Sequence, residues 1–379
     1  MIKIPNPEIY AINPPAAGNY PQGLYKFPFK KDAQTLEQFS QTLVWQPDVL
    51  RTFAADTRYT AILTLEPADS DYTFEGITID DISGLPADAE EISVNLKDRN
   101  LIIKILFKKT AETIAPAQII FYDDFCGKNG SPLYSIDRTK WDFCPEMDRQ
   151  GRSSWRDDMV SVKDGLLRLK FARDPELGKE KSKDAVFAKN WIRAGAVRTR
   201  TKDDRMIFFH GFGFYEARIK FPVVSGTWGA FWLMSPTQRF ITEDGVNGTE
   251  IDIIETIKSH LGGFNSALHW NGYGDKHKFA SSGRNRTADN PRPDFNIFDG
   301  EFHTFALDWS PSYYLFFIDS RLFWRVDGGE FFNNCGINQN PNYIKLTTEG
   351  AVYSGDLPED FSESEMLVDY VKVYNQPQL

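Results

Sequence analysis

The sequence of 379 residues is short of three things that large classes of protein require. It has only three cysteines, which are too few for a disulfide scaffold and are not spaced as zinc ligands. No apolar run reaches the roughly 18 residues that a membrane-spanning helix needs. Basic residues are the minority charge, 43 against 53 acidic ones, whereas nucleic-acid binding favours a basic stripe. We therefore expect a soluble protein with no membrane insertion and no nucleic-acid partner.

Motifs of several common enzyme classes are also missing. The chain has no Walker loop, Rossmann fingerprint, zinc-protease motif or nucleophile elbow. Helical periodicity is scarce, but 14% of the residues are aromatic, and short apolar runs are separated by 27 Gly and 21 Pro. Aromatic-rich short runs punctuated by Gly and Pro predict an all-β protein.

Shifts in composition predict how the chain is divided. An N-terminal stretch rich in Pro, Asn and Gly has little periodicity, and a compact region with strand-like runs follows it. Within that region, residues 59–65 and 72–77 resemble the small immunoglobulin-like modules of bacterial surface and secreted proteins, which implies a β-sandwich that either acts as a spacer, the preferred interpretation, or binds sugar. The predicted parts are an extended leader over 1–31, an immunoglobulin-like β-sandwich module over 32–115, a linker at 116–118 and a second unit over 119–379.

The stretch 248–257 concentrates three carboxylates among isoleucines and threonines, which favour a strand. Because side chains alternate along a strand, Glu250 and Asp252 share one face. Glu255 falls out of this alternation by one residue, and a β-bulge across residues 253–254 would restore it. We expect the three carboxylates to face one space, where their repulsion separates their pKa values into those of an acid and a base. The alternative is a solvated strand face, which repulsion between like charges disfavours.

Neighbouring runs predict a wall and a further polar group beside these acids. In the run 228–234, Trp228 and Trp232 share one strand face and form a flat wall on which sugar rings can stack, although core packing would also explain them. If the run 265–271 pairs with the acid strand as a hairpin, His269 lies near Asp252 and either joins the acid network or is structural. The candidate substrate-binding residues are Trp228, Trp232, His269, Asn271 and Arg198.

The run EIDIIE resembles the bulged E-x-D-x-x-E signature of glycoside hydrolase family 16, typical of its laminarinase, agarase and carrageenase relatives. Other segments resemble parts of the family in the expected order: 119–125 its opening strand, 194–199 the segment before the cleft strands, and 366–374 its closing strand. The resemblance spans about residues 119–376 and implies a β-jelly-roll (concanavalin-like) sandwich. It further implies the catalytic roles: Glu250 as nucleophile, Glu255 as acid/base, and Asp252 as the residue that tunes the nucleophile.

The resemblance implies the activity and its setting. The bulged motif favours a retaining endo-glycosidase that hydrolyses β-1,3- or mixed β-1,3/1,4-glucan by double displacement, acting on its polysaccharide as a monomer. No cofactor is required for the chemistry. A structural calcium ion is expected on the convex face, held by Asp124, Gly165 and Asp369, although a salt bridge at Asp369 would equally satisfy its charge. The first residues lack a signal-peptide core, and the resemblance favours a trimmed start and a secreted or cell-surface protein.

Several alternatives stay open at this point. The substrate could be a galactan-type polysaccharide such as agarose, carrageenan or β-1,3-galactan, and a sulfated polymer would want a basic cleft. The loop arginines at 149, 152 and 156 could supply that cleft or could simply be solvated, and Arg198 could reach the cleft or form a surface salt bridge. A non-catalytic carbohydrate-binding protein is the second functional class, but binding alone does not need three carboxylates. Cys126 could pair with Cys144, or all three thiols could be reduced.

Overall fold

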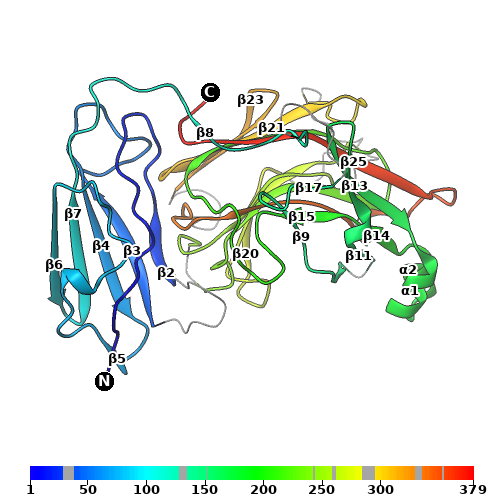
Figure 1. Cartoon of the computed structure of the whole chain (residues 1–379). Helices are drawn as coiled ribbons and strands as arrows, with labels where there is room; N and C mark the ends of the chain where they lie inside the picture. The colour runs from blue at the N-terminus through cyan, green and yellow to red at the C-terminus, as the bar shows by residue number, and fades with distance from the viewer. Residues whose placement is uncertain are drawn as a thin grey trace.

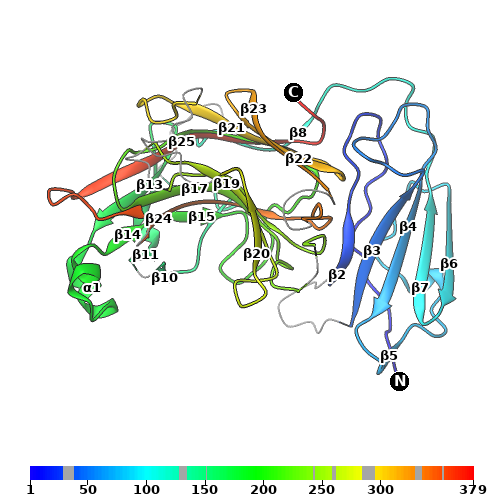
Figure 2. The same cartoon turned by 180° about the vertical axis from the view of Figure 1, so that it is seen from behind.

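The computed structural model describes residues 1–28, 38–127, 135–150, 152–241, 244–257, 262–283, 295–328, 335–351 and 354–379. Over these residues the chain builds two β-rich units that lie side by side, an N-terminal unit and a larger sandwich (Figures 1 and 2). The all-β prediction is confirmed, since helix is confined to short segments at the edge of the larger unit and to single turns. These are α1 (Pro175–Lys181), α2 (Ala185–Lys189), and the 3-10 turns η1 (Ile79–Asp81) and η3 (Asp157–Met159).

The N-terminal unit is built around a sheet whose described strands run in the order β2-β3-β4-β7-β6, with β1 and β5 forming a separate parallel pair. Residues 59–65 alternate between buried and half-buried positions, as expected for a strand that covers a core with one face. Whether this unit is immunoglobulin-like stays a prediction. Its strands are β1 (Ile2–Lys3), β2 (Leu24–Pro28), β3 (Phe39–Gln46), β4 (Thr60–Pro67), β5 (Tyr72–Thr73), β6 (Glu91–Lys97) and β7 (Asn100–Leu106).

The expectation of a separate leader over residues 1–31 is wrong for its described part, 1–28. Strand β2 pairs with β3, and Ile4, Ile9, Leu24 and Phe27 are buried in the core of the N-terminal unit. These apolar residues are spaced irregularly, because irregular backbone delivers most of them to the core. The sequence of this segment therefore shows no helical or strand periodicity, although its apolar side chains are buried in the core.

The larger unit is a sandwich of two antiparallel sheets, apart from one parallel pair, β11 and β14. The first has the order β10-β11-β14-β13-β25-β16-β21-β22-β23, with β12 paired to β13 and β8 to β25. Its strands are β8 (Ile119–Asp123), β10 (Asp148–Arg149), β11 (Ser153–Trp155), β12 (Val160–Lys163), β13 (Leu166–Arg173), β14 (Ile192–Ala194), β16 (Gly213–Lys220), β21 (His303–Trp309), β22 (Tyr313–Ile318), β23 (Arg321–Asp327) and β25 (Glu363–Tyr374).

The second sheet has the order β20-β19-β18-β17-β24-β15-β9 among the described residues. Its central strands β18 and β24 are buried along their whole length, because one face packs on the core and the other lies at the floor of a cavity. Its strands are β9 (Asp142–Phe143), β15 (Ala196–Arg198), β17 (Thr227–Met234), β18 (Glu250–Glu255), β19 (Asn265–Trp270), β20 (Lys278–Ser281) and β24 (Tyr343–Gly350).

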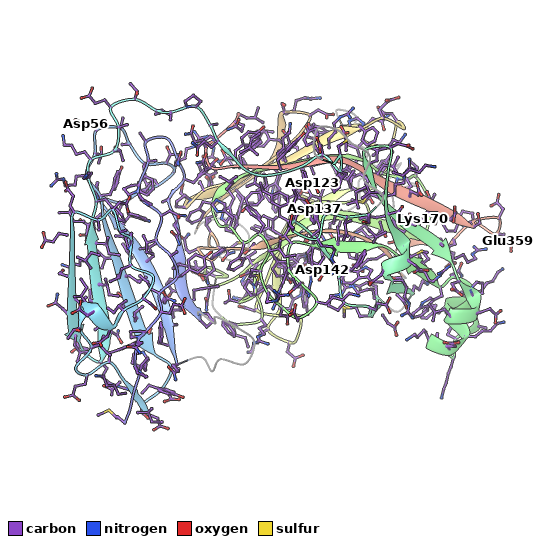
Figure 3. All side chains as sticks on the ribbon, in the orientation of Figure 1. Asp56, Asp123, Asp137, Asp142, Lys170 and Glu359 are labelled. Carbon is purple, nitrogen blue, oxygen red and sulfur yellow. The ribbon has the colours of Figure 1, made fainter. Side chains whose placement is uncertain are left out.

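A buried carboxylate fastens the opening strand of the larger unit. Asp123, at the end of β8, lies inside the larger unit (Figure 3), where its side chain accepts hydrogen bonds from Lys140 Nζ at 3.1 Å and from Trp141 Nε1 at 2.8 Å. Burial raises the pKa of this carboxyl, and the ammonium and indole donors oppose that rise. The Lys-Trp pair thus ties the strand to the loop that follows it.

Buried polar contacts fasten the two units to each other. The Asp308 carboxylate of β21 accepts a hydrogen bond from Tyr20 Oη at 2.7 Å. It also forms an ion pair with the Arg51 guanidinium, whose Nη2 lies 3.1 Å from Asp308 Oδ2. Asn340, just before β24, exchanges hydrogen bonds with Tyr25 of β2: its Oδ1 accepts from the Tyr25 amide at 2.7 Å and its Nδ2 donates to the Tyr25 carbonyl at 2.9 Å. Such contacts fix the relative position of the units, so the N-terminal unit is more than a flexible spacer.

Candidate active site

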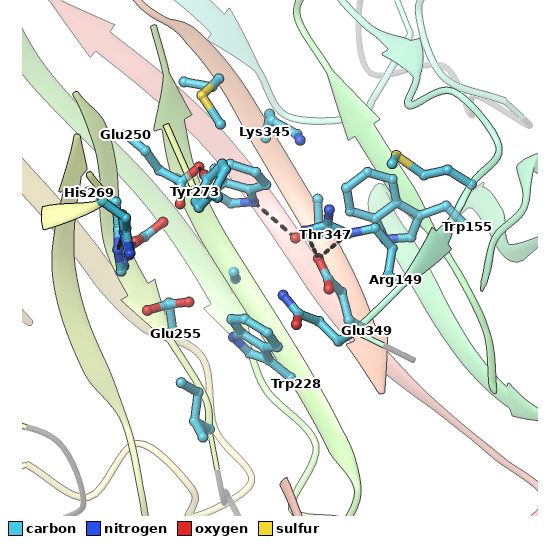
Figure 4. Close-up of a pocket in the computed structure, with 18 residues that line it drawn as sticks. Arg149, Trp155, Trp228, Glu250, Glu255, His269, Tyr273, Lys345, Thr347 and Glu349 are labelled. Carbon is cyan, nitrogen blue, oxygen red and sulfur yellow. Dashed lines mark hydrogen bonds and ion pairs between the residues drawn. The ribbon is translucent and has the colours of Figure 1, made fainter. Parts of the chain in front are cut away.

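The acid strand β18 lies between β17 and β19, and its register carries the predicted bulge. Across β17, Trp232 pairs with Asp252 while Phe231 pairs with Ile254, so one residue of β18 is extra. Across β19, the register likewise shifts between Asp252 and Glu255. Glu250, Asp252 and Glu255 consequently line one cavity of about 490 Å³ (Figure 4). The expected convergence of the three carboxylates is therefore found.

The chain enters β18 through a tightly packed turn. At Gly248 a Cβ atom would come within 2.6 Å of Thr237 Oγ1, so the close approach of the two segments requires glycine. The Thr249 carbonyl accepts a hydrogen bond from Asn342 Nδ2 at 3.0 Å. These contacts, with the segments after β17 and before β24, set the position of the first catalytic candidate, Glu250.

Burial and charge separate the ionisation of the acids. Burial raises the pKa of Glu250 to about 7, while a hydrogen bond from the Tyr273 hydroxyl opposes the rise. The pKa of Asp252 is raised well above its ordinary value, first by burial and then by the charges of Glu255 and Glu250. This rise favours the neutral form of Asp252, which relieves repulsion between the two glutamates.

The hairpin of β18 and β19 places His269 as predicted, with its Nε2 3.4 Å from Asp252 Oδ2. Its other ring nitrogen, Nδ1, lies 2.9 Å from Nε2 of His277, and the two rings are stacked. One ligand atom each of Glu250, Asp252 and His269 lies within 4.8 Å of the others. Of the described residues, this is the group that converges closely enough to hold a metal ion; in the structure it forms a compact acid–imidazole network.

Strand β24 supplies a polar floor that the sequence reasoning missed. Its residues Lys345, Thr347 and Glu349 pair with Trp232, Ala230 and Trp228 of β17, and all of them line the cavity (Figure 4). The indole Nε1 of Trp232 donates to Thr347 Oγ1 at 2.9 Å. The period-two spacing of the three polar residues was the available signal, since it is typical of a strand face.

Two sides of the cavity are formed by residues outside the cleft sheet: one by strands of the other sheet, and one by the segment that follows β19. The Arg149 guanidinium is 3.1 Å from Glu349 Oε1 and lies over the Trp155 ring at 4.4 Å from its centroid. Tyr273 and His277 follow β19 and close the opposite side of the cavity. The Arg149–Glu349 contact is not marked by a local sequence pattern, because it joins strands from distant parts of the chain.

Residues 147–372 match the family model described as Glycosyl hydrolases family 16. The chain belongs to this family. It is 24% identical over 299 residues to Glucan endo-1,3-beta-glucosidase A1 of Niallia circulans, which covers 70% of this chain and 39% of that protein. It is 26% identical over 287 residues to the Keratan-sulfate endo-1,4-beta-galactosidase of Sphingobacterium multivorum, covering 72% of this chain and 58% of that one. The chain thus spans less than two thirds of either relative.

A solved structure shows the same fold for the family 16 unit. The catalytic domain of a laminarinase from Thermotoga petrophila RKU-1 superposes with a TM-score of 0.51 at 18% identity, covering 70% of this chain and all of that domain. The two sheets of the larger unit are therefore the jelly-roll sandwich of family 16, as predicted.

Two of the predicted substrate-binding residues do not line the cavity of this family 16 chain. Arg198 is buried, and its guanidinium donates to the carbonyl of Thr201 at 2.6 Å and pairs with Asp204 at 3.3 Å. The salt-bridge alternative thus describes it, and its assignment to the cleft is wrong. Asn271 follows β19 with a positive φ of 66°, is buried and is not among the described residues that line the cavity, so its role in substrate binding stays a prediction.

The predicted calcium ligands already have protein partners. Asp369 Oδ2 accepts an ion pair from Arg218 Nη1 at 2.6 Å, so its charge does not need a metal ion. Asp124 accepts from the Cys126 amide at 3.1 Å and from Tyr122 Oη at 3.2 Å, while Gly165 lies against the Cys126 thiol. The charge of Asp369 is thus balanced by a side chain of the protein, and the calcium site stays a prediction.

Two smaller expectations have clear outcomes. Cys126, Cys144 and Cys335 are all free thiols, which is the second of the two cysteine alternatives. The described helices are too short and too polar to cross a bilayer.

Proposed function

We propose that this protein is a retaining endo-glycosidase that hydrolyses β-1,3- or mixed β-1,3/1,4-glucan. The observation that carries the proposal is the bulged strand β18, which turns Glu250, Asp252 and Glu255 into one cavity. Paired carboxylates on either side of a scissile bond, one ionised and one protonated, are what glycoside hydrolysis by double displacement requires.

In the first step, Glu250 attacks the anomeric carbon while Glu255 gives its proton to the leaving glycosidic oxygen. The bond from the anomeric carbon to that oxygen breaks as the bond to the Glu250 carboxylate forms. In the second step, Glu255 takes a proton from water, whose oxygen attacks the anomeric carbon and releases Glu250. The product keeps the configuration of the substrate at that carbon.

Tyr273 and Asp252 prepare the nucleophile. The Tyr273 hydroxyl donates to Glu250 Oε2 and so favours the ionised form that attacks. The raised pKa of Asp252 favours its neutral form, and a neutral Asp252 lets Glu250 ionise at a lower pH than it could beside two carboxylates.

The substrate class is supported by the relatives and by the wall of the cavity. The Niallia circulans relative is named for 1,3-β-glucan, and a relative from Fibrobacter succinogenes, 26% identical over 163 residues, is named as a β-glucanase. Trp228 is partly exposed in the cavity, where its ring offers a surface for a sugar. Because such polymers are outside the cell, we propose that the protein is secreted or held at the cell surface and acts as a monomer.

The test is release of reducing sugar from a panel of soluble β-glucans and galactans, with analysis of the product linkage. Glu250→Gln and Glu255→Gln should each abolish hydrolysis without changing the melting curve beyond a few degrees. Azide should restore turnover to Glu250→Ala and give the glycosyl azide of inverted configuration, since it replaces the lost nucleophile. Near-normal turnover in either Gln variant would contradict the assignment.

A galactan-type substrate is the second candidate. One specific observation favours it: the relative named for keratan sulfate aligns over 72% of this chain. Of the three loop arginines, Arg149 lines the cavity, whereas Arg152 pairs with Asp356 and Arg156 with Glu146. The galactans in the panel decide between the two candidates.

A further inference from the structure

A lysine lies at the floor of the cavity between two tryptophan rings. The Lys345 ammonium is 3.8 Å from the ring centroid of Trp232 and 4.7 Å from that of Trp155. Its side chain is 7% exposed and lines the same cavity as the catalytic acids. None of the mechanistic steps above uses it.

This ammonium lacks the partners that a buried cation normally has. Among the described residues, its contacts are with the two rings, and no oxygen accepts a hydrogen bond from its Nζ. Ring faces attract a cation, but they do not replace the three acceptors that water offers to an ammonium group. Charges in protein interiors are normally paired, so this ammonium at the cavity floor is a candidate partner for an anion that enters the cavity.

The acids of the cavity do not neutralise Lys345 directly. Glu349, its neighbour on β24, is engaged by the Arg149 guanidinium through Nε and Nη2 at 3.2 and 3.1 Å. Burial raises the pKa of Asp252, across β17 from it, well above its ordinary value, which disfavours the charged form of that acid. Strand β17 separates β24 from β18, so the backbones of Lys345 and the acids are two strand spacings, about 10 Å, apart.

We propose that Lys345 is a specificity-determining residue that binds an anionic substituent, a sulfate ester or a carboxylate, on a sugar bound in this cavity. The proposal rests on the glycosidase site described above and narrows its substrate class to a polysaccharide that carries negative charge beside the scissile linkage. It therefore favours a charged polymer, such as the sulfated members of the galactan-type candidate, over a neutral glucan. Lysine suits this task because its ammonium is a point charge that accepts an anion from several directions.

The electrostatics of the side chain agree with this assignment. Burial, with a contribution from the charge of Arg149, lowers the pKa of Lys345 to about 8 against the opposing effect of Glu250 and Glu349. A bound anion would give the ammonium a partner of opposite charge and would raise that pKa again. The substituent would thus be bound by a cation that is already desolvated, which makes the contact worth more than one at the surface.

The competing explanation is that Lys345 donates to a neutral sugar hydroxyl. Both explanations predict weaker activity when Lys345 is changed, so loss of activity does not separate them. They differ in the ratio of activity on a charged polymer to activity on the same polymer without the charge. That ratio is the quantity to measure.

The experiment compares three forms of one soluble β-1,3-glucan: neutral, partly sulfated at the primary hydroxyl, and oxidised there to the carboxylate. Keratan sulfate before and after desulfation forms a second pair. We expect the wild type to favour one anionic form over its neutral partner by about tenfold in kcat/KM, with a preference that falls as salt rises. The sulfate and carboxylate arms identify which anion the cleft accepts.

Three variants make the comparison specific. Lys345→Met keeps the length and apolar stem between the rings and should bring the ratio close to one, whereas Lys345→Arg should keep most of it. Lys372→Met is the matched control, because Lys372 also lies over two rings, at 4.0 Å from Tyr370 and 5.7 Å from Tyr122, but on the other sheet. This control should leave the ratio unchanged.

Two results would overturn the proposal: equal rates of the wild type on charged and neutral forms, or an unchanged preference in Lys345→Met. Binding of the same polymers to Glu255→Gln, measured by titration calorimetry, separates this outcome from failure of the proposed function. If the wild type hydrolyses none of the polymers, the calorimetric preference and its loss in the Lys345→Met, Glu255→Gln double variant still decide the role of Lys345.

Discussion

Truncating Asn340 should destabilise the protein more than any other single change at the contact between its two units. The Asn340 side chain is fully buried and links the N-terminal unit to the cleft sheet. Besides its two hydrogen bonds with Tyr25, its Nδ2 donates to the Asn247 carbonyl at 2.7 Å and to Asn247 Oδ1 at 2.9 Å. Asn247 lies three residues before Glu250, so one amide holds both the unit boundary and the entry to β18.

The size of the effect follows from what Asn340→Ala leaves behind. Each lost hydrogen bond costs about 1 kcal/mol, and each buried group left without a partner costs about 1–3 kcal/mol. With the Tyr25 amide and two carbonyls affected, and some relaxation around the site, we expect a loss of about 3–4 kcal/mol. Since Asn247 would be freed to move, kcat/KM should also fall at a temperature where the variant is still folded.

Urea denaturation followed by tryptophan fluorescence measures the first effect, and initial rates measure the second. Ser312→Ala is the matched control, because Ser312 Oγ also bridges the two units, donating to the Leu50 carbonyl at 2.8 Å, but at an exposed position. Its change should stay within about 0.5 kcal/mol. A loss in Asn340→Ala no larger than in Ser312→Ala would refute the reasoning and would show that the units are coupled elsewhere.

Three further predictions concern the cleft and the convex face. Wild-type kcat/KM should fall as the pH drops through about 7, where Glu250 becomes protonated. Tyr273→Phe should move this acidic limb of the pH profile to higher pH, because it removes a hydrogen bond to the ionised form of Glu250. An acidic limb that does not move would exclude this role of Tyr273. Trp228→Ala should raise KM on a polymer about 3–10-fold with kcat little changed, as expected from loss of a stacking surface, and an unchanged KM would place the ring outside the binding path. A melting temperature that rises with calcium in the wild type but not in Asp369→Ala would support the calcium site, whereas identical curves with calcium and with excess chelator would leave Arg218 as the partner of Asp369.

The sequence predicted the catalytic strand well because its information is local. The spacing of Glu250, Asp252 and Glu255 along one strand, and the misfit of Glu255 by one residue, were enough to infer the bulge that the register shows. The position of His269 followed from a hairpin between neighbouring strands, which is also a local relation. Both depend on the period of a strand and not on the rest of the fold.

The remainder of the site depends on which distant strands become neighbours. Lys345 and Glu349 follow the acid strand by about a hundred residues, and they reach the cleft because β24 inserts beside β17. Arg198 has the right residue type and lies on the adjacent β15, but its guanidinium turns to Asp204 instead of the cavity. The prediction of a separate leader failed for a related reason: its apolar residues lie on irregular backbone, so their spacing in the sequence has no period that would reveal their burial.

The position of β25 has a consequence for how the protein is made. This strand, Glu363–Tyr374, pairs with β13, β16 and β8, all of which precede it by more than a hundred residues. Until synthesis reaches residue 374, the sheet therefore has an open slot at its centre, with apolar side chains and unpaired backbone on both sides of it. The described strands of the N-terminal sheet all come from residues 24–106, so this unit can form before the rest of the chain is made. A nascent chain that stalls before residue 363 should consequently need a chaperone. Deletions within β25 should show themselves mainly as aggregation during expression, because the exposed edges of β13 and β16 can pair with other chains.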